Sequence, residues 1–320
     1  MNRRALRYWA EYVAFRTCVC ILQSLSPRRC ACLARFVAFL VHRILPRKLT
    51  RYDVARQNLR TAFGDQLSDR ETDELIYRMW IHLCRLVAEI VQLPRELNLG
   101  KLHEAIVFRK HRDIVRAMCS SRPVIVLSGH FGNWEVALSL LGLFGFPMSV
   151  VARELDNPYL NKWFDDFRRQ TGHRTISKKG GGAEMVERLE AGGKLALLGD
   201  QDAGSGGIFV DFFGRPASTF KSIALLALEY KAVICVGYAL RLHDGFATHA
   251  GVRFEMGCEQ VIDPLAIDSD DEIREMTQQY TAALERLIRR APEQYFWVHR
   301  RWKSVPGQRK RRCNRRRKAG

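Results

Sequence analysis

Residues 124–135 read VIVLSGHFGNWE, an apolar run that ends in a Gly-His-Phe-Gly turn. The run VIVLS is typical of a buried strand, and the apolar segment that follows from Trp134 indicates a helix. His130 therefore falls on a strand-to-helix turn, where the backbone is exposed and a helix N-terminus is near. This stretch predicts one strand–turn–helix unit of an α/β protein.

The chain beyond Pro123 continues in the same pattern, with short apolar runs alternating with helical segments and no internal repeat. Strands separated by helices predict an α/β layer architecture whose functional loops lie at the carboxyl ends of the strands. The expected strands are 123–129, 146–153, 173–177, 194–200, 232–242 and 246–257, and the expected helices are 134–144, 157–172, 183–193, 218–232 and 270–295.

The first hundred residues are predicted to be helical. Residues 8–25 and 31–45 are strongly apolar with scattered arginines, which favours helices lying in a membrane interface. An ordinary helical subdomain packed on the core is the alternative. Ser68 and Glu71 form a capping-box pattern that starts a further helix. Because no run of about 18 uncharged apolar residues occurs, a membrane-spanning helix is not expected.

The 320 residues are 47% hydrophobic and carry a net charge of +18, enough for one large domain with or without a helical appendage. From Lys303 onward the chain holds nine basic residues and no acidic one, which predicts a solvated, disordered tail. Attachment to anionic lipid headgroups or to nucleic acid is the sharper alternative. We therefore expect a helical region at 1–100, an α/β domain at 101–302 and a basic tail at 303–320.

The nine cysteines do not show the spacing of a metal site. Cys18 and Cys20, like Cys30 and Cys32, are spaced C-x-C, whereas zinc sites favour C-x2-C. We expect free thiols in a reducing compartment, and no metal site.

His130 and Glu135 are the first candidates for chemistry. Residues five apart on a continuous helix are rotated by roughly 140°, so the two side chains can meet only if the chain bends between them. Gly129 and Gly132 permit such a bend. A carboxylate paired with one imidazole nitrogen raises the basicity of the other, which can then remove a proton from a hydroxyl attacking an activated acyl group. The alternative is that His130 is a core histidine.

Three further candidates stand at predicted strand ends. Asp200 ends the strand 194–200 on the rim where His130 emerges, so it can orient His130 as a second carboxylate, with Gln201 as a polar contact. The alternative is that Asp200 only begins a turn. Arg153 also follows a strand, and its guanidinium can bind a phosphate or serve as a surface cation.

Two other segments carry weaker signals. Phe212 and Phe213 can line an acyl-chain groove or belong to the core. Residues 177–182, SKKGGG, superficially resemble a phosphate loop but lack the Walker spacing, and we interpret them as a flexible entry to the next helix.

The segment GHFGNWE resembles the His-x4-Asp/Glu box of the lysophospholipid acyltransferase superfamily, and the chain is most similar to its lipid A biosynthesis acyltransferases. Five more segments fit that family in order: RQNLRTAFG, VARELDNPYL, LLGDQDAG, GIFVDFFGRPASTF and EQYFWVHRRWK. The resemblance implies a fold like that of glycerol-3-phosphate acyltransferase, in which a central mixed sheet is flanked by helices and preceded here by the membrane-interfacial helices.

The same resemblance implies transfer of a fatty acyl chain from acyl carrier protein or coenzyme A to a lipid hydroxyl, at the cytoplasmic face of a bacterial inner membrane. His130 would be the general base and Glu135 its box carboxylate, with Arg153, Asp200 and Gln201 binding substrate. Residues 299–301 would contact anionic substrate. No cofactor is implied. A Kdo2-lipid IVA-like lipid A precursor is the first candidate acceptor, and a lysophospholipid, ornithine lipid or mannosylated phosphoinositide are alternatives.

A nucleic-acid-binding protein led by the arginine-rich tail is the competing class of function. No zinc finger, helix-turn-helix or aromatic RNA-binding motif accompanies the tail, so no nucleic-acid partner is expected.

Overall fold

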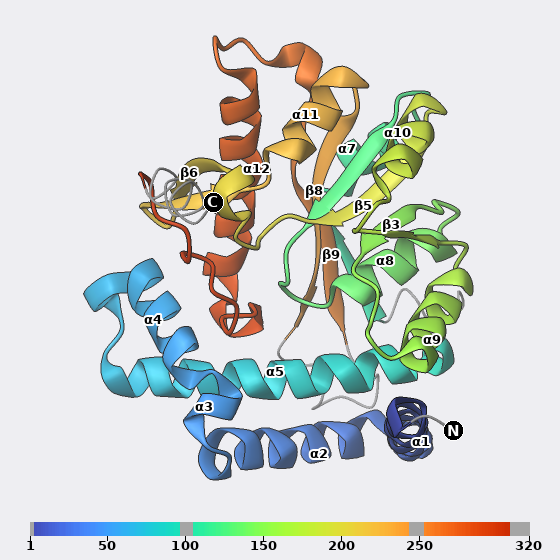
Figure 1. Cartoon of the computed structure of the whole chain (residues 1–320), viewed down its shortest axis with the longest axis vertical. Coiled ribbons are helices and arrows are strands. Elements are labelled where there is room, and N and C mark those ends of the chain that lie inside the picture. Colours follow the sequence, from blue (N-terminus) through green and yellow to red (C-terminus); the bar gives the residue numbers. More distant parts are fainter. Residues whose placement is uncertain (1–2, 97–104, 243–252, 308–320) are drawn as a thin grey trace, which may run out of the picture.

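A seven-stranded mixed sheet forms the centre of the computed structural model, which describes residues 3–96, 105–242 and 253–307 (Figure 1). The strand order is β1-β9-β8-β2-β5-β3-β4, and the pairs are parallel except β8 with β9. The strands are β1 Ile106–Arg109, β2 Val124–Ser128, β3 Ser149–Ala152, β4 Arg174–Ser177, β5 Lys194–Leu198, β8 Val233–Arg241 and β9 Phe254–Ile262. The predicted α/β fold with a mixed central sheet is confirmed.

Helices cover both faces of the sheet, which explains why β2 is apolar throughout. Val124 and Val126 face the side covered by α7 (His111–Met118), α8 (Trp134–Leu143) and α9 (Pro158–Arg169). Ile125 and Leu127 face the opposite side. That side is covered by α10 (Gly182–Glu190), α11 (Lys221–Glu229) and α12 (Glu272–Arg290).

A helical layer lies against one edge of the α/β part. It comprises α1 (Arg3–Ser24), α2 (Pro27–Phe39), a π-helical turn (Leu40–Ile44), α3 (Arg47–Thr50), α4 (Tyr52–Phe63) and α5 (Asp69–Glu96). Helix α5 runs between α2 and the sheet (Figure 1). Its Gln92 Nε2 donates to the carbonyls of Leu22, in the last turn of α1, and of Leu25, between α1 and α2, at 3.0 and 2.9 Å. The predicted capping box is confirmed, because Ser68 N donates to Glu71 Oε2 at 2.8 Å. Within the described ranges, no helix combines the length and apolar character needed to cross a bilayer.

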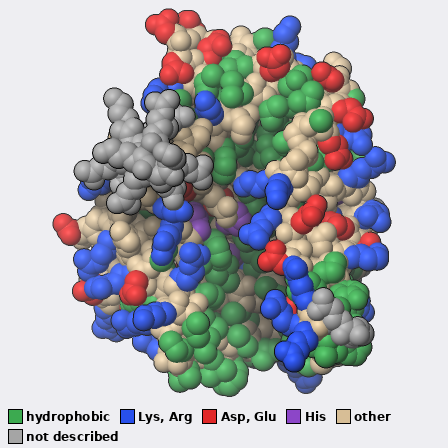
Figure 2. All heavy atoms as spheres, in the orientation of Figure 1, with side chains coloured by type: hydrophobic (Ala, Val, Ile, Leu, Met, Phe, Trp, Pro, Cys, Tyr) green, Lys and Arg blue, Asp and Glu red, His purple; other side chains and the backbone are tan. Residues whose placement is uncertain are grey.

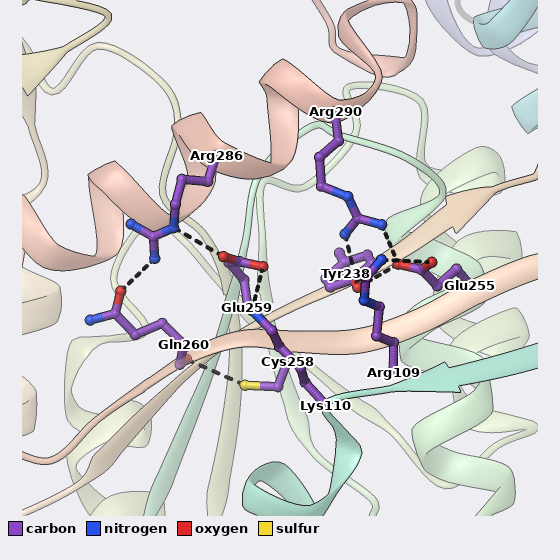
Figure 3. Close-up of polar contacts among 9 residues, drawn as sticks. All are labelled: Arg109, Lys110, Tyr238, Glu255, Cys258, Glu259, Gln260, Arg286 and Arg290. Atoms are coloured by element: carbon purple, nitrogen blue, oxygen red, sulfur yellow. Dashed lines mark hydrogen bonds and ion pairs between the residues drawn. The ribbon is translucent and has the colours of Figure 1, made fainter.

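Two acidic side chains of β9 fasten α12 and the edge strand to the sheet (Figure 3). Glu255 binds Arg290 of α12 and accepts a hydrogen bond of 2.6 Å from the Tyr238 hydroxyl. Glu259 binds Arg286 at 2.9 Å and Lys110 at 3.5 Å. These contacts fix the β8–β9 half of the sheet and the orientation of the Tyr238 ring.

The structure departs from the sequence prediction between residues 204 and 220. The expected helix over 218–232 begins only at Lys221, because Arg215–Thr219 forms β7, which pairs with β6 (Ile208–Phe212) in an antiparallel hairpin. The strand expected over 246–257 begins at Phe254, and 246–252 lie outside the described residues. The same holds for 97–104, where the first domain boundary was predicted, and for 308–320 of the basic tail.

Candidate active site

The neighbouring strands β2 and β5 bring His130 and Asp200 together. The two strands are parallel with Ser128 opposite Leu198, so both chains leave the sheet at the same edge. The amide of Gly199 donates to the Ser128 carbonyl at 2.9 Å, which continues the ladder to the last residue before Asp200. Two side chains 70 positions apart in sequence thus meet because their strands end side by side.

Two glycines are required by the turn after β2. A Cβ atom at Gly129 would lie 3.2 Å from the Cβ of Asp200, so a larger residue would require that side chain to shift by a few tenths of an ångström. Gly132 has a φ of +58°, and a Cβ there would lie 2.1 Å from the Ala239 carbonyl oxygen. The glycines therefore bring the chain against β5 and β8, where Asp200 is within reach of His130.

Asp200 holds His130 through both carboxylate oxygens. Oδ2 accepts the backbone N–H of His130 at 3.0 Å, and Oδ1 lies 2.9 Å from Nδ1 of the ring. An ionised carboxylate can only accept, so Nδ1 carries a proton and Nε2 is the basic nitrogen of the neutral ring. The side chain of His130 is 20% exposed, whereas that of Asp200 is fully buried.

Opposing effects set the pKa of His130. Burial lowers it, but the charge of Asp200 and the hydrogen bond to that carboxylate outweigh burial, so the pKa of His130 is raised above its ordinary value. Burial alone would raise the pKa of Asp200, yet the attraction and hydrogen bonds of His130 hold that pKa well below its usual range. The pair therefore contains an ionised aspartate and a histidine whose neutral form is a stronger base than free imidazole.

The C-terminal segment, residues 294–302, packs against the other side of the His130–Asp200 pair. Phe296 N donates to the His130 carbonyl at 3.0 Å, and the ring of His299 lies 6.3 Å from that of His130, centre to centre. Nε2 of His299 is 3.1 Å from the Tyr295 hydroxyl and 3.3 Å from the Asp200 carbonyl. Burial lowers the pKa of His299, which favours its neutral form beside His130.

A cavity of about 480 Å³ opens beside His130, between the sheet and α8. Its inner wall is mostly apolar, with residues from β2, β3, β5, β8, β9, α7 and α8. In the space-filling view, histidine lies in a hollow with Lys and Arg side chains around it and hydrophobic side chains beneath (Figure 2). A proton-accepting group at the rim of an apolar cavity is the arrangement expected of an enzyme acting on a substrate with a hydrocarbon part.

Glu135 does not bind His130, contrary to the pairing we expected. The Asn133 side chain accepts from the Val136 amide at 3.2 Å, so α8 begins at Trp134 and Glu135 lies on its first turn. From there Glu135 points toward α9, and its Oε1 accepts from Arg168 Nη2 at 2.6 Å. Glu135 and Arg168 both line the cavity, and Asp200 takes the position predicted for Glu135.

The remaining predicted site residues lie around the cavity mouth. Arg153 and Gln201 both line the cavity; Arg153 is 81% exposed and lies 3.3 Å from Asp156. Lys178 of the SKKGGG segment also lines it, with its ammonium 4.7 Å from the centre of the Phe220 ring. The charge of Lys178 opposes the effect of Asp200 on the pKa of His130 and lowers it. No role was predicted for Lys178, although it directly follows the predicted strand 173–177.

Phe212 and Phe213 are core residues, packed around Trp297 and Trp302, which confirms the core alternative for both. The expectation that Arg301 contacts substrate was wrong. Arg301 is 1% exposed and cannot contact a substrate from solution: its guanidinium donates to Ser218 O and Thr219 Oγ1, at 2.7 and 2.6 Å. It serves to hold β7 against the C-terminal segment.

The described residues contain no group of three or more His, Cys, Asp or Glu placed to hold a metal ion. The eight cysteines among them are free thiols.

The chain as a whole is similar to known proteins. Residues 1–304 match the family model described as bacterial lipid A biosynthesis acyltransferase. A phosphatidylinositol mannoside acyltransferase of Mycolicibacterium smegmatis is 26% identical over 209 residues, which cover 61% of this chain and 68% of that protein. The lipid A biosynthesis palmitoleoyltransferase of Escherichia coli is 27% identical over 197 residues, covering 61% and 60%. The lipid A biosynthesis lauroyltransferase of that organism is 22% identical over 260 residues, covering 80% of each chain.

Proposed function

The chain belongs to the bacterial lipid A biosynthesis acyltransferase family, and on that basis we propose that it transfers a fatty acyl chain from a thioester to a lipid hydroxyl, with His130 as general base. The observation that carries the proposal is the His130–Asp200 pair at the mouth of the apolar cavity. The donor is a fatty acyl thioester of acyl carrier protein or of coenzyme A. Both donors are acidic, and the net charge of +18 favours encounter with them.

The chemistry follows from the tautomer of His130. Nε2 takes the proton of the acceptor hydroxyl as its oxygen attacks the thioester carbonyl carbon, and the imidazolium that forms is stabilised by Asp200. The tetrahedral intermediate collapses by breaking its carbon–sulfur bond, and the imidazolium returns the proton to the departing sulfur. The products are an ester and a free thiol, and no nucleophilic side chain is needed.

Lys178 is the cation best placed to stabilise the charge that develops on the carbonyl oxygen. It lines the same cavity as His130 and already acts on the ring electrostatically. A fixed positive charge beside the developing oxyanion contributes more inside a partly desolvated cleft than it would in water. Arg153 and Gln201, on the same rim, would then contact the polar part of the donor or acceptor.

The first candidate acceptor is a lipid A precursor of the Kdo2-lipid IVA type. The family model and the two Escherichia coli relatives support it. The Mycolicibacterium smegmatis relative favours a second candidate, a mannosylated phosphoinositide, for which the same base and cavity would serve. Both acceptors carry hydroxyl groups as well as acyl chains, and both carry phosphate that Arg153 can bind.

We further propose that the helical layer rests on the cytoplasmic face of the inner membrane. Helix α2 and the turn after it expose an apolar stripe at helical spacing, made of Leu33, Phe36, Val37, Leu40 and Ile44. Arginines such as Arg28, Arg29 and Arg43 lie on the same segment, as in helices that bind anionic headgroups from within the interface.

The His130→Ala variant tests the base assignment. We expect a loss of turnover of roughly 10²–10⁴-fold, the usual contribution of a general base, with unchanged folding and vesicle binding. Mass spectrometry of lipids from cells that lack the protein should show one lipid class missing one acyl chain, and should identify the acceptor. Turnover near that of the wild type in His130→Ala would refute the proposed mechanism.

A further inference from the structure

A buried polar network joins α5 to the turn that carries His130. It comprises His82 and Glu89 of α5, Arg241 at the end of β8, and Asn133 in the turn. None of these side chains takes part in the chemistry above, and each residue is at most 7% exposed. Four polar groups collected at one buried place require an explanation beyond packing.

Arg241 is the centre of the network. Its guanidinium binds both carboxylate oxygens of Glu89, and Nη1 lies 2.8 Å from Nδ1 of His82. Because a guanidinium can only donate, Nδ1 of His82 accepts, and the ring is neutral with its proton on Nε2. That ring donates to the backbone of Gly132. Burial, with the charges of Arg241 and Arg85, holds the pKa of His82 far below its ordinary value, so the ring remains neutral.

The turn is held on every side. The Asn133 amide Nδ2 donates to Glu89 Oε2 at 2.9 Å, while the Asn133 backbone N–H donates to Ala239 O at 2.8 Å. Gly132 N donates to the Gln294 carbonyl at 2.9 Å, and Gln294 also bonds the backbone of Arg241. The two residues that follow His130 and Phe131 are thereby fixed to α5, to β8 and to the C-terminal segment.

Stability alone is a weak reason for such a network. A buried Arg–Glu pair loses so much hydration that apolar residues of similar size are often equally stable or more so. The pair does supply a fixed geometry, however. His82 and Glu89 are seven residues apart, about two helical turns, so both project from the same face of α5 toward the turn.

We propose that His82, Glu89 and Arg241 are positioning residues, which hold residues 129–133 so that Nδ1 of His130 meets Asp200 and Nε2 faces the cavity. Helix α5 thus acts as a rigid support for the catalytic turn, although it contributes no atom to the reaction. The inference rests on the proposed acyl transfer, which supplies its assay.

Asn133→Ser gives the sharpest test, because serine keeps an oxygen that can cap α8 but lacks the amide that binds Glu89. The assay is release of coenzyme A thiol from palmitoyl-coenzyme A by the purified full chain, with a Kdo-bearing tetra-acylated lipid A precursor in micelles. We expect kcat to fall roughly 10- to 100-fold with KM unchanged, the effect of displacing a reacting group. We also expect the acidic limb of the rate–pH profile to move to lower pH as the contact with Asp200 loosens.

Asn157→Ser is the matched control. Asn157 is likewise a buried helix cap whose amide binds another helix, since it caps α9 and donates to Tyr8 O of α1 at 2.9 Å. A loss of folded protein alone would lower the rate equally at every pH and would affect both variants. Equal kcat values and pH midpoints for Asn133→Ser and Asn157→Ser would overturn the proposal.

Two variants of His82 provide an independent test in case Asn133→Ser does not fold. His82→Gln can still accept from Arg241 and donate to Gly132, whereas His82→Leu can do neither. We expect the glutamine variant to retain most of the kcat and the leucine variant to lose it; similar activity of the two would contradict the proposal. His130→Ala is measured alongside. Activity of that variant refutes the proposed function, while an inactive His130→Ala with a fully active His82→Leu refutes only the positioning role.

Discussion

Asp200 restrains His130 more strongly than a single hydrogen bond would. One carboxylate oxygen accepts the backbone N–H and the other meets the ring of the same residue, so the carboxylate cannot rotate without losing both contacts. The ring orientation, its tautomer and its basicity are therefore set by one buried group. This predicts that Asp200 affects both the rate and its dependence on pH.

In Asp200→Asn we expect turnover to fall by about 10²–10⁴-fold, because the amide no longer stabilises the imidazolium. The carboxylate raises the pKa of His130, so its removal lowers that pKa. Since the neutral ring is the active form, the acidic limb of the kcat/KM profile should move to lower pH. Measuring kcat/KM between about pH 5 and 9 tests both expectations.

Glu135→Gln serves as the comparison for that variant. Glu135 binds Arg168 rather than His130. The change should therefore lower activity by disturbing the cavity wall, but leave the midpoint of the acidic limb of the rate–pH profile unchanged. A shift of the midpoint in Glu135→Gln as large as in Asp200→Asn would contradict the arrangement of carboxylates described here.

The two carboxylates also show what local sequence can and cannot predict. The spacing of His130 and Glu135 identified the right segment, but the pairing was wrong because Asn133 caps the helix and sends Glu135 toward α9. Asp200 was found by a different argument, the shared edge of parallel strands, which does not depend on distance along the chain. The partner Arg168 had no sequence signal, since it is one of several charged residues on an amphipathic helix.

Buried strands were predictable from the sequence, and short strands with few buried residues were not. β2 and β5 are apolar runs bounded by turn residues, and both were expected. β1 has four residues, of which one is buried, so it lacks the alternation of buried and exposed residues that predicts a strand. β7 reads Arg-Pro-Ala-Ser-Thr, and it forms a strand because it pairs with β6 and is held by Arg301. Such strands depend on tertiary contacts that no window of sequence contains.

The β8–β9 pair offers a test of what the cavity binds. Gly237 lines the cavity, and a Cβ there would lie 3.6 Å from a methyl of Val126 and 4.0 Å from one of Ile114, which are ordinary contacts. Gly237→Val should therefore fold and fill part of the cavity. If the acyl chain occupies this end, the valine side chain should exclude two of its methylenes from the cavity. The lost burial costs about 1.6 kcal/mol and lowers kcat/KM for long acyl chains roughly tenfold.

Competition between C10 and C16 acyl-coenzyme A donors measures this preference. Gly206→Val, in a loop with open space at the Cβ position, is the matched control and should behave as the wild type. An unchanged ratio of C10 to C16 transfer in Gly237→Val would show that the acyl chain does not reach this part of the cavity.

The cavity and the apolar stripe of α2 lie on the same face of the protein (Figure 2). Figure 2 shows hydrophobic side chains gathered over α2 and, on that same face, the hollow that contains histidine. Lys and Arg side chains lie between and beside them. A lipid acceptor could therefore keep its tails near the bilayer surface while its headgroup reaches the cavity rim, where cations can meet its phosphates.

The apolar stripe of α2 should hold the protein on the membrane. Phe36 and Ile44 are 59% and 65% exposed, and burying each in the bilayer interface would contribute about 1.5–3 kcal/mol. We therefore expect Phe36→Glu combined with Ile44→Glu to weaken binding to vesicles of phosphatidylethanolamine and phosphatidylglycerol by at least about 100-fold.

Leu265→Glu is the control, because Leu265 is equally exposed at 65% but follows β9, away from the helical layer. Wild-type binding should also weaken as salt is added, since the arginines of the layer act through screened charge. Vesicle co-sedimentation in which the double variant and Leu265→Glu bind equally well would show that α2 does not rest on the membrane.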